Sequence, residues 1–183
     1  MKINKKIPMI LFAFAAFLGV VSYINVSATD TPMSAQQIDR IYGSCTLAKN
    51  TLNQLHASDA LLRVNMGQIY ESMSTKLMSK FNTRVSNNKF DNSNLASITN
   101  SYNSTLDTFR SDYIKYEEQL TSANNIDCKK QQVSFFDAVS SARNDRIQVH
   151  DDVVKMNQYI DQYQAAVNQF EKDYIDTTDG AKN

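Results

Sequence analysis

Hydrophobic residues recur at alternating steps of three and four along most of the chain, which is the spacing of one apolar stripe on a helix. The first stripe consists of Ile38, Ile41, Cys45, Ala48, Leu52, Leu55, Leu62, Met66, Ile69, Met73, Leu77 and Phe81. Pro32 precedes it, and Ser34 with Gln37 fits a capping box, a pattern typical of helix starts. The sequence therefore predicts a first helix over about residues 34–86, whose stripe drifts slightly after Met73, where the steps become four and four.

Two further stripes predict helices over residues 94–122 and 134–176. The second stripe consists of Leu95, Ile98, Tyr102, Leu106, Phe109, Tyr113, Tyr116 and Leu120. The third consists of Val139, Ala142, Arg146, Val149, Val153, Met156, Ile160, Tyr163, Val167, Phe170 and Tyr174. Polar segments rich in turn-forming residues separate the stripes, and Phe90 in the first of them is a candidate plug for the end of a bundle. No strand pattern is present, so we expect an all-α fold with a flexible tail over 177–183.

The two cysteines of the chain predict how the helices pair. Folding the first two helices into an antiparallel hairpin brings together residues at equal distances from the turn. The midpoint between Cys45 and Cys128 is 86.5, at the edge of the predicted loop. A disulfide needs α-carbons within about 7 Å, and this hairpin supplies that proximity. We therefore predict a Cys45–Cys128 disulfide in an elongated, antiparallel, up-down-up, coiled-coil-like bundle of three helices. The alternative is a core Cys45 and a free Cys128.

The same register brings together the two polar residues that interrupt the stripes. A residue of the third helix should face a residue about 85 positions earlier, so Arg146 should lie within about 3 Å of the height of Asp59. We predict that these two side chains pair, and that the pair fixes the register of the helices more than it adds stability. Arg63 and Arg143 are rival partners for the carboxylate.

The N-terminal segment has the order of a secretory signal. Lysines at its start are followed by an uncharged stretch, residues 7–28, which ends in the small residues Val26, Ser27 and Ala28. We predict a signal peptide over residues 1–28; the alternative is an uncleaved membrane anchor, because about 20 apolar residues span a bilayer. Either interpretation places the bundle, residues 29–176, outside the cytoplasm, secreted or at the cell surface, where disulfides persist.

Charge excludes some partners. After removal of residues 1–28 the chain keeps 155 residues, with 16 basic and 19 acidic side chains, and a net charge of −3. Nucleic acid binding needs a concentrated positive face, so we expect no nucleic acid partner. Contact with a membrane is expected only through residues 7–28, if they remain attached.

No known catalytic motif occurs in the sequence. His56 and His150 would be roughly 13 Å apart along the helix axis in the predicted register, too far to share a metal. We therefore predict no catalytic, metal-binding or cofactor-binding residues, and no enzymatic activity.

The expected function is that of a non-enzymatic interaction or structural module, which binds a protein partner or self-associates. Tyr42, Tyr70 and Tyr159 lie off the strict stripes and are candidate interface residues, since amphipathic aromatic residues favour interfaces. The alternative is an extracytoplasmic bundle that binds a small molecule or lipid between its helices. Its cavity would be lined by tyrosines and by Met66, Met73, Met78 and Met156.

Overall fold

The computed structural model describes residues 32–180, and in this range it is helical, with no β-strand. The prediction of an all-α fold is therefore confirmed. The chain divides into a unit of residues 1–32 and a helical unit of residues 33–183, and the description concerns the helical unit. The predicted signal peptide or anchor lies outside the described residues, as do residues 181–183.

The first helical stretch is unbroken but changes its hydrogen-bond pattern twice. It comprises helix α1, Ala35–Ser72, the π-helix η1, Met73–Met78, and helix α2, Ser79–Asn87. The predicted capping box is present: the Gln37 backbone N–H donates to the Ser34 hydroxyl, and the Ser34 N–H donates to the Gln37 side chain over 2.8 Å. The sequence thus predicted the start of this stretch from its cap and its end from the loop that follows.

The buried face of this stretch differs from the predicted stripe in its second half. Leu62 and Leu77, both on the predicted stripe, are 57% and 51% exposed, whereas Tyr70 is buried. A pattern of alternating threes and fours rotates around a straight α-helix by about 20° per heptad. Asp59 and Tyr70, which are 11 residues apart and both buried, instead stay on one face, because 11 residues make almost three whole turns.

The π-helix carries this buried face onward to α2. Tyr70, Ser74 and Met78 are four residues apart and all buried. A π-helix bonds each residue to one five positions away, so its turns hold more residues than α turns. Steps of four therefore stay close to one face through η1, which is where the sequence shows its four-and-four spacing.

The other two helices extend slightly beyond their predicted ends. Helix α3 spans Ser93–Asn125 and helix α4 spans Gln132–Gly180. The tail predicted from residue 177 therefore begins as a continuation of α4. Aspartates stabilise turns in both connections: Asp91 accepts a hydrogen bond from the Ser93 N–H over 2.9 Å, and Asp127 accepts one from the Lys129 N–H over 3.0 Å.

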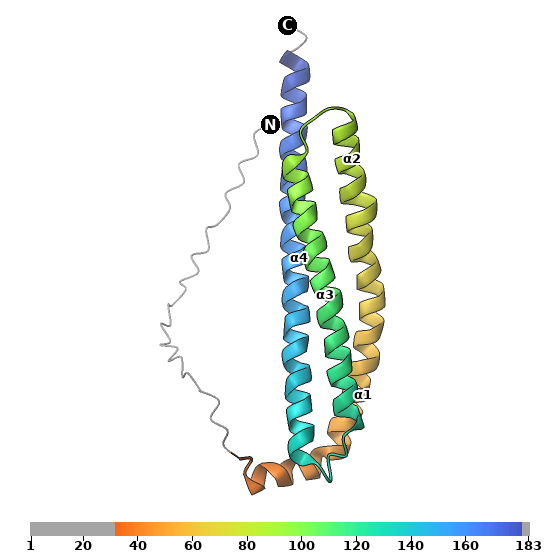
Figure 1. Cartoon of the computed structure of the whole chain (residues 1–183), viewed down its shortest axis with the longest axis vertical. Coiled ribbons are helices and arrows are strands. Elements are labelled where there is room, and N and C mark those ends of the chain that lie inside the picture. Colours follow the sequence, from red (N-terminus) through yellow and green to blue (C-terminus); the bar gives the residue numbers. More distant parts are fainter. Residues whose placement is uncertain (1–31, 181–183) are drawn as a thin grey trace, which may run out of the picture. The chain divides into compact units, whose positions relative to one another are not determined.

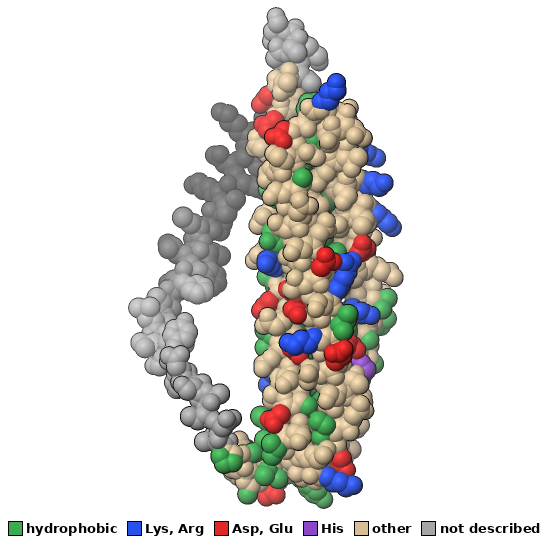
Figure 2. Space-filling model, in the orientation of Figure 1, with side chains coloured by type: hydrophobic (Ala, Val, Ile, Leu, Met, Phe, Trp, Pro, Cys, Tyr) green, Lys and Arg blue, Asp and Glu red, His purple; other side chains and the backbone are tan. Residues whose placement is uncertain are grey.

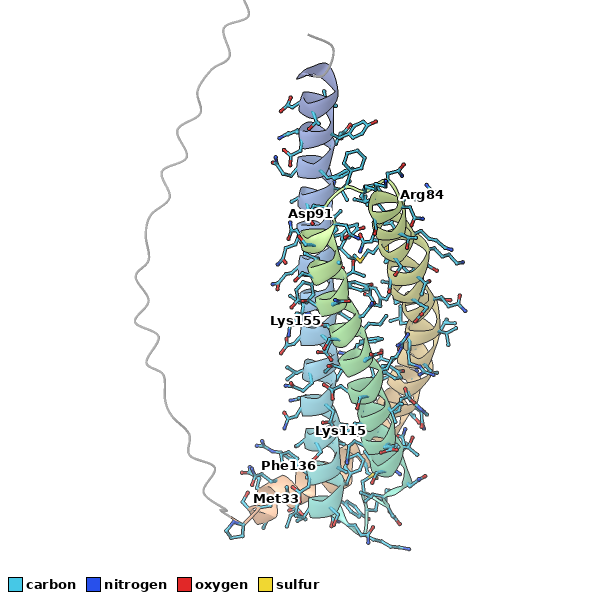
Figure 3. The ribbon with its side chains drawn as sticks, turned by 45° about the horizontal axis from the view of Figure 1, so that its top comes forward. Met33, Arg84, Asp91, Lys115, Phe136 and Lys155 are labelled. Atoms are coloured by element: carbon cyan, nitrogen blue, oxygen red, sulfur yellow. A yellow bond between two sulfur atoms is a disulfide. The ribbon has the colours of Figure 1, made fainter. Side chains whose placement is uncertain are left out.

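The helices of this unit lie side by side along most of their length (Figure 1). Helices α3 and α4 form the most extensive contact, while α1 touches both more sparsely. We call the end of the unit that contains the last turn of α3 and the first turn of α4 the foot. The first turns of α1 lie across this foot (Figures 1 and 3). Figure 3 places Met33 and Phe136 at this foot, and Arg84 and Asp91 toward the opposite end.

One hydrophobic cluster fills the half of the unit that contains η1. Its buried residues are Tyr70, Met78, Val85, Leu95, Tyr102, Leu106, Phe109, Met156, Tyr163 and Ala166. The Tyr102 hydroxyl donates to the Tyr70 carbonyl over 3.0 Å, and the Tyr163 hydroxyl donates to the Met78 carbonyl over 3.1 Å. Burial raises the pKa of both hydroxyls to about 12, so both remain donors at neutral pH. A tyrosine of α3 thus binds the last turn of α1 before η1, and a tyrosine of α4 binds the last residue of η1.

Aromatic packing closes this end of the unit. Phe90, from the loop between α2 and α3, makes edge-to-face contacts with Phe170 and Tyr174, with ring centroids 5.8 and 5.4 Å apart. Phe90 remains 38% exposed. The loop therefore covers the end of the core at the position where the sequence predicted a plug.

A second hydrophobic cluster surrounds the cysteines at the foot. Its buried residues are Cys45, Leu52, Tyr113, Tyr116, Leu120, Ala123, Cys128, Phe135 and Ala142. The disulfide between Cys45 and Cys128 joins α-carbons 5.6 Å apart, so the structure places the cysteines at disulfide distance, as predicted. The bond ties the start of α1 to the connection between α3 and α4.

Removing the disulfide is expected to destabilise the helical unit. The bridge spans a sequence separation of 83 residues, and the chain-entropy estimate for such a loop is about 4–5 kcal/mol, of which measured values often reach only part. We expect the double variant Cys45→Ser with Cys128→Ser to lose about 2–4 kcal/mol in urea unfolding. Reductant should destabilise the unmodified protein by a similar amount and leave the double variant unchanged. Equal stability of the oxidised and reduced protein would contradict this role of the bond.

Candidate functional site

A polar cluster in the foot half of the unit joins all three long helices. Asp59 of α1 is only 8% exposed. Its Oδ2 atom accepts hydrogen bonds from the Tyr116 hydroxyl of α3 over 2.8 Å and from Arg146 Nε of α4 over 2.9 Å. The structure thus brings together the predicted register pair, Asp59 and Arg146. Tyr116 is a third member, which the sequence pattern placed only as a core residue.

The cluster keeps its charges fixed near neutral pH. Burial alone would raise the pKa of Asp59, but the hydrogen bonds from Arg146 and Tyr116 and the guanidinium charge outweigh burial, so this pKa lies below its ordinary value. Burial, together with the bond to the Asp59 carboxylate, raises the pKa of the Tyr116 hydroxyl. These shifts move the proton exchange of all three groups away from pH 7, so the carboxylate and the guanidinium keep their charges there. We call the cluster of Asp59, Tyr116 and Arg146 the clamp.

The rival arginines lie elsewhere. The guanidinium of Arg63 sits over the ring of Tyr113, 4.9 Å from its centroid, and Arg143 lies at the edge of a surface hollow. The Tyr113 hydroxyl donates to Glu117, whose second carboxylate oxygen is 2.9 Å from His56 Nε2. A second polar chain, from His56 to Arg63, therefore links α1 to α3 beside the clamp.

The described residues contain no group of three or more His, Cys, Asp or Glu side chains placed to hold a metal ion. His56 pairs with Glu117, and His150 lies 3.4 Å from Asp151 on its own helix. The two histidines thus have separate carboxylate neighbours.

The three candidate interface tyrosines have different environments. Tyr42 is 53% exposed, with Lys129 Nζ 5.8 Å from its ring centroid. Tyr159 is half-buried against the core. Tyr70 is buried and packs edge-to-face on Phe109, so its assignment to an interface is wrong. The 11-residue step from Asp59 returns Tyr70 to the buried face, although it lies off the three-four stripe.

Two adjoining hollows follow the line between α1 and α4. The first has a volume of 540 Å³, and its lining includes Leu47, Leu55 and Val139. The second has a volume of 360 Å³ and is lined by all three helices; Met66 is in its lining. Tyr116 and Arg146 are part of the lining of both hollows, so the clamp lies between them. We define this pair of hollows as the α1–α4 groove.

The sequence contained a signal for this groove. Residues 61–69, "LLRVNMGQI", carry apolar side chains on several sides of α1, more than one buried face can cover. Leu61, Leu62 and Val64 are 64%, 57% and 49% exposed. The stripe placed Leu62 in the core and therefore did not indicate the groove, whereas Met66, expected to line a cavity in the alternative interpretation, does line the second hollow.

The rest of the visible surface is mixed in character. Figure 2 shows acidic and basic side chains scattered over the face it presents, with exposed hydrophobic side chains mainly in the half nearer the foot. Among the described residues, no helix combines the length and the apolar character needed to cross a bilayer.

The clamp is expected to depend on the pairing of its charges. Asp59→Arg and Arg146→Asp should each lower the free energy of unfolding by about 1–3 kcal/mol, because each leaves one charge facing another of the same sign beside the core. The double variant should recover at least half of the summed loss in urea unfolding. Arg143→Asp, an arginine of the groove outside the clamp, should change stability by less than about 0.5 kcal/mol. Absence of recovery in the double variant would reject the pairing as the source of register.

The pH dependence gives a second readout of the same pair. Because the folded-state pKa of Asp59 lies below the ordinary value of 3.8, its contribution to stability is present above that value and is lost as the pH falls through the folded-state pKa. The stability difference between the protein and Asp59→Asn should be constant from pH 7 to about pH 5 and shrink below about pH 4. A difference that does not change over this range would show that the carboxylate charge is not what stabilises the unit.

No protein-family model matches this chain, and no curated protein or solved structure is detectably similar to it. The clamp and the groove of the chain itself therefore carry the functional argument.

Proposed function

We propose that this protein is a non-enzymatic interaction module, exported from the cell, whose helical unit is an up-down-up bundle of three long helices. The observation that carries the interaction role is the α1–α4 groove with its uncovered apolar side chains. Leu47 and Leu62 line it and are 71% and 57% exposed. Large exposed apolar patches rimmed by polar residues mark sites that interact with proteins, membranes or ligands.

Two observations support export. The sequence of residues 1–28 has the basic, apolar and small-residue order of a secretory signal. The disulfide between Cys45 and Cys128 is a bond that persists in oxidising compartments and is rare in reducing ones. Together they favour a place in the medium or at the cell surface, with membrane contact only through residues 7–28 if these remain attached.

The chemistry of the clamp supports a non-enzymatic role. General acid–base catalysis needs groups whose pKa lies near the working pH, whereas hydrogen bonding and burial move the pKa values of Asp59 and Tyr116 away from neutrality. Ligand binding inside the core has less support than interaction, because Met78 and Met156, two of the methionines predicted to line a cavity, are completely buried in packed side chains.

Export can be tested by the intact mass of the native protein. We would purify it separately from culture medium, membranes and cytosol, and measure each sample with and without reductant. The expected species begins at Thr29 and gains about two daltons on reduction, one hydrogen for each cysteine. A full-length mass in the membrane fraction would identify a tethered surface protein. A full-length, fully reduced protein confined to the cytosol would overturn export.

The interaction role can be tested in producing cells with a photo-reactive phenylalanine analogue in place of Leu62. Irradiation should yield a cross-linked adduct of higher mass, because Leu62 lines the groove. The matched control places the analogue at Leu77, which is 51% exposed and lines neither hollow of the groove. Equal adducts at both positions would show non-specific contact, and no adduct at either position would overturn the interaction role.

A further inference from the structure

The α1–α4 groove has the length and direction of a helix. Its α4 wall extends from Phe135 to Val153, and 18 residues of α-helix rise about 27 Å. The α1 wall covers at least the same length, from Ser44 to Tyr70. A helix of about five turns could therefore lie along the groove, over the Asp59–Arg146 pair that joins its two walls. A compact small molecule would fill only part of it.

Both walls carry apolar residues at the spacing that is typical of packed helices. On α4, Val149 and Val153 are four residues apart, and on α1, Leu62 and Met66 have the same spacing. Apolar residues at steps of three and four form the holes that receive the side chains of a packed helix. Met66 remains 38% exposed. The chain itself thus supplies two walls and leaves the space between them to another helix.

The charges around the groove restrict the chemistry of that helix. Arg63, Arg143 and Arg146 are part of the lining, together with His150, whereas the lining contains one acidic residue, Asp59. Asp59 is already paired with Arg146. Among the described residues, neither Arg63 nor Arg143 forms an ion pair, so acidic side chains on an incoming helix could pair with these two arginines.

The same charges argue against a second copy of this chain as the occupant. A symmetric dimer places the same patch of both subunits face to face. Docking of two grooves would bring Arg63 and Arg143 of one copy close to the arginines of the other. Juxtaposition of like charges disfavours an interface.

We propose that the α1–α4 groove binds an amphipathic helix of a partner protein, with its apolar stripe against the groove and acidic side chains on its flanks. This proposal rests on the interaction role proposed above and names the partner's chemistry. The docked helix covers the exposed leucines of α1, and its carboxylates pair with Arg63 and Arg143. The product is a four-helix arrangement in which the partner supplies the fourth helix.

The test uses two synthetic helical peptides of five turns with the same leucine stripe, one with glutamates on both flanks and one with lysines. Each is titrated by fluorescence anisotropy into the native, disulfide-bonded protein. We expect the glutamate peptide to bind at least tenfold more tightly than the lysine peptide, with an affinity that falls as salt is added. Equal affinities, a preference for lysine, or no binding of either peptide would overturn the proposal.

Matched variants localise the binding. Leu62→Asp should weaken binding of the glutamate peptide at least tenfold, whereas Leu61→Asp, at the adjacent residue of similar exposure outside both hollows, should change it less than threefold. Arg143→Glu should reduce the preference for glutamate over lysine and leave the Asp59 clamp in place. Circular dichroism melting of each variant separates loss of binding from loss of folding. Equal losses in Leu61→Asp and Leu62→Asp would place the peptide outside the groove.

The result of the peptide titration can be distinguished from the result of the test of the interaction role. If Leu62 forms a specific adduct in cells while neither peptide binds, the interaction role stands and the acidic helix is wrong. An adduct of twice the protein's own mass would identify a second copy and also overturn the acidic helix. Thermal stabilisation by dodecanoate without binding of either peptide would instead assign the groove to an anionic amphiphile.

Discussion

The contact on which the arrangement of this unit depends is the one between Asp59, Tyr116 and Arg146. Each residue comes from a different long helix, so a single carboxylate joins three elements at one height. A buried charge without partners is strongly unfavourable, and a slip of one turn would separate Asp59 from both donors by about 5.4 Å. Apolar stripes alone tolerate such slips better, because one methyl group can replace another.

The clamp matters most for α1, because the other long helices hold each other more extensively. Helices α3 and α4 form a close pair, further linked by the ion pair of Lys115 with Asp145, 2.7 Å apart; Lys115 is labelled in Figure 3. Helix α1 is attached by the disulfide at the foot, by the clamp, by the Tyr102 bond to the Tyr70 carbonyl, and by polar side chains that reach α3. These side chains are His56, which pairs with Glu117, and Lys49, which donates to the Asn124 carbonyl. Between these points α1 leaves apolar surface uncovered, and this uncovered surface forms one side of the groove.

The sequence predicted the features that depend on single strong constraints. The long periodic stripes with few helix-breaking residues predicted the helices. The symmetric placement of the two cysteines about one loop predicted their pairing. The resulting register then predicted the partner of Asp59. It did not predict the buried face of the second half of α1, because a small difference in period accumulates over several turns; the π-helix adds its own rotation only after Ser72. For this reason Tyr70 was expected at an interface and Leu62 in the core. The hydrogen bond of Tyr116 was not predicted because a tyrosine on a stripe does not reveal where its hydroxyl points.

The disulfide also determines which part of the chain would carry a mechanical load. Tension applied between the two ends passes from Cys45 directly to Cys128, so the intervening chain is bypassed. A separation of 83 residues corresponds to roughly 280 Å of fully extended polypeptide that tension cannot release while the bond is intact. The bypassed chain includes most of α1 and all of η1, α2 and α3. Helix α4 lies outside the covalent loop, and it is therefore the helix that would peel away first, opening the groove from one side.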